Sequence, residues 1–61
     1  MAWVAVDRDN TEWIFHEKPF RSDDGYWYSG SQFIYIPEGS IKKLIGRELS
    51  WDDSPVKLKE D

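Results

Sequence analysis

Candidate acid–base chemistry in this chain rests on one histidine. His16 is the only histidine, and Glu12 precedes it by four residues. On a β-strand the two side chains share a face, so the carboxylate could orient the imidazole. Catalysis by such a pair also needs a cleft and a third polar group. No nucleophile elbow, phosphate-binding glycine loop or HExxH motif is found in the sequence, and we predict a non-enzymatic protein with no catalytic residue.

The candidate metal site is at residues 7–12, which resemble the start of a calcium-binding loop. Oxygen ligands stand at alternate positions there, but Glu12 occupies the position of the invariant glycine and Lys18 that of the bidentate glutamate. The chain has no cysteine, which removes thiolate nucleophiles and zinc–thiolate sites. We expect no metal and no cofactor, and Asp and Asn at these positions are typical of a hairpin loop.

The net charge of the chain favours some binding partners over others. Twelve acidic and eight basic residues give a net charge of −4, which disfavours general binding to a phosphate backbone and suits a basic partner surface. The one basic cluster, Lys42, Lys43 and Arg47, is typical of a solvated helix face. The acidic residues of the turns form an alternative surface with which the chain could mimic a nucleic acid: Asp7, Asp9, Asp23, Asp24, Asp52 and Asp53.

Aromatic residues are the strongest chemical signal. Four Trp, three Tyr and three Phe make up 16% of 61 residues. A chain this short has a marginal core, and large rings bury much apolar area, so part of the surplus is structural. The remaining rings are candidates for stacking on bases or for protein contacts.

Two hairpins are expected to position these rings. Residues 2–6 and 11–16 flank a four-residue polar loop that would pair Val6 with Thr11 and Val4 with Trp13. Residues 17–25 are interpreted as a connection. Residues 26–29 and 32–36 flank Gly30-Ser31, which suits a type II′ turn. This second hairpin places Tyr26, Tyr28, Phe33 and Tyr35 on one face.

A short helix and an edge strand complete the pattern. Ser40 is the expected N-cap, Ile41, Leu44 and Ile45 form an apolar stripe, and Gly46 is expected at the C-terminal end. Residues 56–59 alternate as an edge strand protected by its lysines. We therefore predict one domain over residues 1–61, of the α+β class: a small twisted antiparallel sheet in the order β-β-β-β-α-β with one short helix at about 40–46. A five-stranded SH3-like barrel is the alternative.

Targeting signals are not visible. Asp7 ends the first apolar run, which has no basic residues before it, and no stretch approaches the roughly 20 apolar residues of a membrane span. We expect a cytoplasmic protein with no membrane partner.

Two segments carry a resemblance. Residues 37–56 look like the C-terminal half, and residues 3–7 with 11–15 the N-terminal hairpin, of small uncharacterised proteins from phages and mobile elements. The resemblance implies a phage-type setting, in which compact acidic proteins often inhibit host or defence proteins. It transfers no catalytic or binding residue.

These observations favour a small acidic protein-binding module, in its narrower form a phage-type inhibitor. The expected binding surface is Tyr26, Tyr28, Phe33 and Tyr35, since Tyr and other aromatics are enriched at interfaces. Self-association is a second way to cover these rings. The alternatives are a nucleic-acid mimic acting through its acidic loops and a weak single-stranded nucleic-acid binder using the aromatic sheet face.

Overall fold

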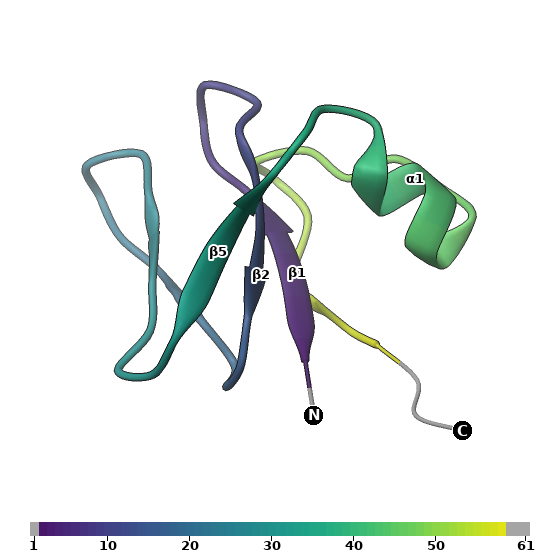
Figure 1. The fold of residues 1–61 in the computed structure, drawn as a ribbon. Helices are drawn as coiled ribbons and strands as arrows, with labels where there is room; N and C mark the ends of the chain where they lie inside the picture. The colour runs from purple at the N-terminus through teal and green to yellow at the C-terminus, as the bar shows by residue number, and fades with distance from the viewer. Residues whose placement is uncertain (1, 59–61) are drawn as a thin grey trace.

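The computed structural model describes residues 2–58 and consists mostly of strands with one short helix (Figure 1). A four-stranded sheet has the order β5-β2-β1-β6, and a separate two-stranded sheet pairs β3 with β4; every pairing is antiparallel. The elements in chain order are β1 (Trp3–Val6), β2 (Glu12–Phe15), β3 (Phe20–Arg21), β4 (Trp27–Tyr28), β5 (Phe33–Ile36), α1 (Ser40–Ile45) and β6 (Val56–Lys57). Antiparallel sheets with one short helix confirm the coarse prediction, whereas the pairings within residues 2–58 do not confirm a five-stranded barrel.

The β1–β2 hairpin forms where it was expected, but its register differs by one residue. Val6 lies opposite Glu12 and not Thr11. The cause is Asn10, which has a φ of 70°. The Asp7 N–H donates to the Thr11 oxygen at 2.9 Å and the Asn10 N–H to the Asp7 oxygen at 2.9 Å, so the loop has three residues. A tight turn followed by a left-handed residue is a common three-residue hairpin loop.

This shift matters because a one-residue slip moves every side chain to the other face. Val4 therefore shares a face with Ile14 and not with Trp13. One core cluster combines Val4, Val6 and Ile36 with Ile41 of α1. The other core cluster lies on the opposite face and contains Ala5, Phe15 and Trp27, with Trp3, Trp13 and Trp51 packed against it.

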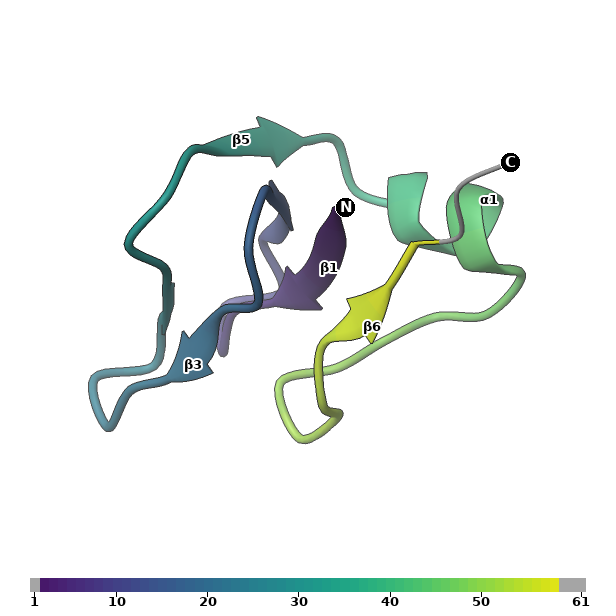
Figure 2. The same cartoon turned by 90° about the horizontal axis from the view of Figure 1, so that it is seen from below.

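Both faces of the four-stranded sheet are thus covered. Figures 1 and 2 show α1 on one side and the β3–β4 hairpin on the other. Trp27 of β4 packs in the second core cluster, so β3 and β4 supply the second layer.

The second predicted hairpin does not form. β4 pairs with β3, placing Phe20 opposite Tyr28, and β5 pairs with β2, placing Ile14 opposite Ile34. A type II′ turn needs a positive φ at its first central residue, and Gly30 is not among the residues with positive φ. Residues 17–25, expected as a connection, therefore contribute the strand β3, and residues 29–32 lead from one sheet to the other.

The helix α1 covers the predicted segment but begins differently. Its end is as expected: the Gly46 N–H donates to the Lys42 oxygen at 2.9 Å. At its start the prediction of Ser40 as the N-cap was wrong: the N-cap is Gly39, which has no side chain to accept a hydrogen bond. The carboxylate of Glu12, on β2, instead accepts hydrogen bonds from the N–H groups of Gly39 (2.7 Å) and Ile41 (2.8 Å). Ile41 is buried, whereas Leu44 of the predicted stripe is exposed.

β6 and β5 form the two edges of the four-stranded sheet. β6 pairs with β1, which confirms an edge strand here, and Lys59 of that prediction lies outside the described residues. β5 is the opposite edge and has no lysine or proline within Phe33–Ile36. Within residues 2–58, no helix has the length and apolar character needed to cross a membrane.

Candidate functional site

The four rings predicted for binding are all at the surface. Tyr26, Tyr28, Phe33 and Tyr35 are between 44% and 63% exposed. Phe33 and Tyr35 project from β5, Tyr28 from β4, and Tyr26 immediately precedes β4. We call these four residues the aromatic face. They do not come from one hairpin, as predicted, but from neighbouring sheets.

Two further rings, those of Trp13 and Phe20, contact the aromatic face. Trp13 of β2 is half-buried and meets Phe33 edge-on at 5.5 Å and Tyr35 at 5.7 Å between ring centroids. Tyr28 stacks on Phe20 at 6.2 Å with an interplanar angle of 29°. Phe20 is exposed, so it extends the surface next to Tyr28. The local sequence did not reveal this because Phe20 and Tyr28 meet only through β3–β4 pairing.

A hollow of about 290 Å³ is lined by residues of the main sheet and of β4. We call it the aromatic hollow. Its polar lining residues are Asp7 and Ser29, and Tyr35 of the aromatic face lies outside it. Its six aromatic lining residues are Trp13, Phe15, Tyr26, Trp27, Tyr28 and Phe33.

Asp7 is the buried carboxylate of the aromatic hollow, at 3% exposure. One carboxylate oxygen accepts the Trp13 indole N–H at 2.9 Å, and the other accepts the Trp27 backbone N–H at 2.9 Å. Burial raises the pKa of Asp7 from its ordinary value against these two hydrogen bonds, and the nearby carboxylates of Asp9 and Asp24 raise it further. Asp7 therefore joins the first hairpin to β4.

Asp24 holds the Tyr28 ring at the rim of the aromatic hollow. The Tyr28 hydroxyl donates to its carboxylate at 2.6 Å, and the Tyr26 N–H donates to the other oxygen at 3.3 Å. The hydroxyl lowers the pKa of Asp24, and the same hydrogen bond raises the pKa of Tyr28. These contacts orient Tyr28 from the turn that precedes β4.

One of the six residues of the predicted acidic surface is buried in the structure. Asp7 is buried and so does not belong to an exposed acidic surface. Asp9 accepts the Thr11 N–H at 3.0 Å, which lowers the pKa of Asp9. Asp53 accepts the Ser50 N–H at 2.8 Å. These two carboxylates, like that of Asp24, stabilise turns. The remaining two, Asp23 and Asp52, are exposed.

Arg21 and Trp51 form a contact that sequence reasoning missed. The Arg21 guanidinium donates to the backbone oxygens of Trp51 (2.6 Å) and Asp53 (3.1 Å). It also lies 4.9 Å from the Trp27 ring centroid and 5.1 Å from that of Trp51, whose ring is 5.3 Å from Arg8. Residues 30 positions apart leave no local sequence pattern. The contact attaches the turn at residues 51–53 to the β3–β4 layer.

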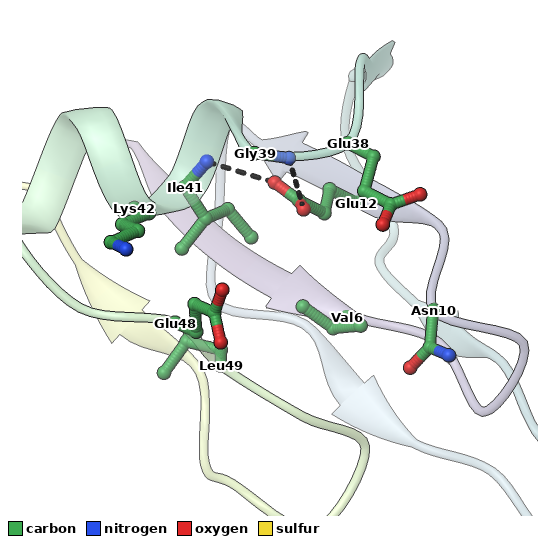
Figure 3. Close-up of a pocket in the computed structure, with 9 residues that line it drawn as sticks. All are labelled: Val6, Asn10, Glu12, Glu38, Gly39, Ile41, Lys42, Glu48 and Leu49. Carbon is green, nitrogen blue, oxygen red and sulfur yellow. Dashed lines mark hydrogen bonds between the residues drawn. The ribbon is translucent and has the colours of Figure 1, made fainter.

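A second hollow, of about 360 Å³, lies beside the start of α1 (Figure 3). Val6, Ile41 and Leu49 form its apolar part. Figure 3 shows that the Glu12 carboxylate in this hollow points at the helix backbone. Glu12 is therefore engaged by the N–H groups of α1 and is not free to orient His16, which is exposed.

Within residues 2–58, no three His, Cys, Asp or Glu side chains gather closely enough to hold a metal ion. The structure thus offers the aromatic face and its hollow as the main candidate site.

Comparison with protein-family models, with curated protein sequences and with solved structures finds no match to this chain.

Proposed function

We propose that this chain is a non-enzymatic protein-binding module whose contact surface is the aromatic face. The observation that carries the proposal is the exposure of four large rings, three of which line an aromatic hollow, although both faces of the sheet already have a covering layer. A contiguous exposed aromatic patch is a frequent mark of an interaction site. Tyr, Trp and Phe are enriched at the centres of protein interfaces, where they supply most of the binding energy.

The open edge of β5 supports the same surface. The His16 N–H donates to the Gln32 oxygen at 2.9 Å, and along an antiparallel pair the bonded positions alternate. Ile34 therefore turns its backbone groups toward β2, whereas Phe33 and Tyr35 turn theirs toward the open edge. An extended partner segment would find backbone donors and acceptors there, beside the exposed rings.

The narrower form of the proposal is an inhibitor of a host or defence protein. Two sequence features support it: the resemblance to phage and mobile-element proteins, and the net charge of −4, which suits a basic partner surface.

Affinity capture with matched variants tests the proposal. Cells that naturally contain the protein supply the lysate, and the captured proteins are identified by mass spectrometry. The double variant Tyr28→Ser, Tyr35→Ser should lose the partner while keeping its circular dichroism spectrum. Leu44→Ser is the matched control, because Leu44 is equally exposed but lies on α1. A partner retained by the double variant, or lost equally from the control, would refute the role of the aromatic face.

Self-association at the same edge is the competing use of this surface. Sedimentation velocity over a hundredfold range of concentration distinguishes the two, because a dimer formed through β5 would dissociate on dilution. The proposal predicts a monomer throughout. A concentration-dependent dimer that Tyr35→Ser abolishes would assign the aromatic face to a second copy of the chain.

A further inference from the structure

The aromatic hollow carries an electrostatic preference in addition to its apolar character. Asp7 lines it, and the Asp24 carboxylate is bonded to the hydroxyl of Tyr28 at its rim. No lysine or arginine is among the residues of 2–58 that line it. Asp7 is the one charged residue among the described residues that line the hollow, so the lining itself favours a cation over an anion.

Aromatic walls add to this preference. The face of an aromatic ring carries partial negative charge, and a cation placed over it is attracted, most strongly where water is excluded. Six aromatic residues line the hollow. A cation entering it would meet ring faces at the rim and the buried carboxylate of Asp7 beyond them.

Among protein cations, a guanidinium fits this environment better than an ammonium. It is planar, so it stacks on rings, and it is more weakly hydrated, so it loses less on entering an apolar space. The molecule already pairs arginine with tryptophan: Arg21 lies 4.9 Å from the ring centroid of Trp27, which lines the hollow, and Arg8 lies 5.3 Å from that of Trp51.

We infer that the aromatic hollow receives an arginine side chain of the protein partner, an inference that rests on the proposed function. The guanidinium stacks against Tyr26 and Phe33 at the rim, and its charge is balanced by Asp7. The aromatic face then has two parts: Tyr26, Tyr28 and Phe33 surround the arginine, while Tyr35 contacts the partner outside the hollow.

Small probes test this inference without the partner. N-acetyl-arginine amide is titrated into the ¹⁵N-labelled protein, and the indole N–H signals of Trp13 and Trp27 are followed. N-acetyl-citrulline amide is the matched neutral probe, since it has nearly the same shape without the charge. We expect saturable shifts with the arginine probe and at least about fivefold weaker binding of the citrulline probe. Equal binding of both probes, or no binding of either, would overturn the inference.

Variants at the rim locate the probe. Phe33→Ser and Tyr26→Ser should each weaken the arginine probe by about threefold or more. Leu44→Ser is the control, because Leu44 is exposed on α1 and does not line the hollow, and it should leave probe binding unchanged. Equal losses in all three variants would contradict binding in the hollow. Asp7→Asn is not used as a variant. The amide has one oxygen for two N–H donors, so its NH₂ group would face the other donor and destabilise the fold.

The choice of cation is tested by N-acetyl-lysine amide, which should bind more weakly than the arginine probe; tighter or equal binding would overturn the assignment to arginine.

The outcome of the probe titrations can be distinguished from the outcome of the capture experiment. If the probes fail while the double variant still loses its partner, the arginine inference falls and the protein-binding proposal stands. If the arginine probe binds and the double variant keeps its partner, the role of the aromatic face in partner binding falls, and with it the assignment of the hollow to a partner's arginine.

Discussion

Single carboxylates connect segments that are distant along this chain. Glu12 bonds the start of α1, 27 and 29 residues away, and Asp7 bonds Trp27, 20 residues away. Sequence reasoning placed Glu12 beside a histidine and Asp7 on an acidic surface, because both residues have ordinary local roles in a hairpin. Their long-range partners follow only from the packing of α1 and β4 against that hairpin.

The replacement Glu12→Ala tests the long-range helix cap. It removes the acceptor for two N–H groups at the start of α1, and loss of a helix cap costs about 1–2 kcal/mol. Chemical denaturation measures the change. Ser40→Ala is the control, because the N-cap residue is Gly39 and not Ser40, and it should change stability by less than about 0.5 kcal/mol. A larger loss for Ser40→Ala than for Glu12→Ala would restore Ser40 as the cap.

The titration of Asp7 provides a pH test. Because burial raises the pKa of Asp7, the folded state takes up its proton more readily than the unfolded state does. The contribution of Asp7 to stability therefore increases as pH falls through the raised pKa toward the ordinary value of 3.8, and decreases as pH rises. Asp9 and Asp24, with lowered pKa values, act in the opposite sense: their contribution is present above 3.8 and is lost as pH falls through their folded pKa values.

Carboxyl ¹³C titration by NMR measures these three groups separately. The midpoint of Asp7 should lie above 3.8, and the midpoints of Asp9 and Asp24 below it. In Tyr28→Phe, which retains the ring but lacks the hydroxyl donor, the midpoint of Asp24 should move up toward 3.8. An Asp7 midpoint at or below 3.8 would mean that the hydrogen bonds from Trp27 and Trp13 outweigh the effect of burial.

At the scale of elements, turn conformation decides which strands pair. A left-handed Asn10 shortens the first loop and shifts the β1–β2 register, and Gly30 without a positive φ removes the second hairpin. The strands of the two predicted hairpins were recognised from their composition, as were the helix and the edge strand. The pairing of the second hairpin was not recognised, because a turn of Gly and Ser is compatible with a hairpin and with a connection between sheets.

Two glycine replacements test this account of the turns. Gly30→Ala adds a methyl group with no atom within 4 Å at a residue without positive φ, so it should be neutral or stabilise the protein by about 0.4–1 kcal/mol. Gly25→Ala, with a φ of 94° and the Arg8 Cβ at 3.3 Å, should destabilise it by about 1–2 kcal/mol. Thermal and chemical denaturation measure both variants. A cost at Gly30 equal to that at Gly25 would point to a type II′ turn after all.

At the scale of the whole molecule, charge and exposed rings must be considered together. Exposed aromatics also suit base stacking, so nucleic acid is the main alternative ligand for the aromatic face. The net charge of −4 and the carboxylate in the aromatic hollow oppose a phosphate backbone. The four rings predicted for binding are exposed, but their arrangement across two sheets depends on pairings that the sequence did not reveal.

A titration with oligothymidine tests the nucleic-acid alternative. The fluorescence of the four tryptophans should remain unchanged at low salt, up to about 100 µM oligonucleotide, where non-specific binding is normally strongest. Parallel titration of a known single-strand-binding protein shows that the assay detects binding. Saturable quenching that weakens with added salt would contradict the proposal of a protein partner.

The most direct test of the account is to map the captured partner onto the ¹⁵N-labelled protein by chemical-shift perturbation. The account predicts the largest changes at Tyr26, Tyr28, Phe33 and Tyr35 and at the indole N–H of Trp13, with little change along α1. Changes centred on α1, around Lys42, Lys43 and Leu44, or confined to the exposed acidic turns, would contradict it.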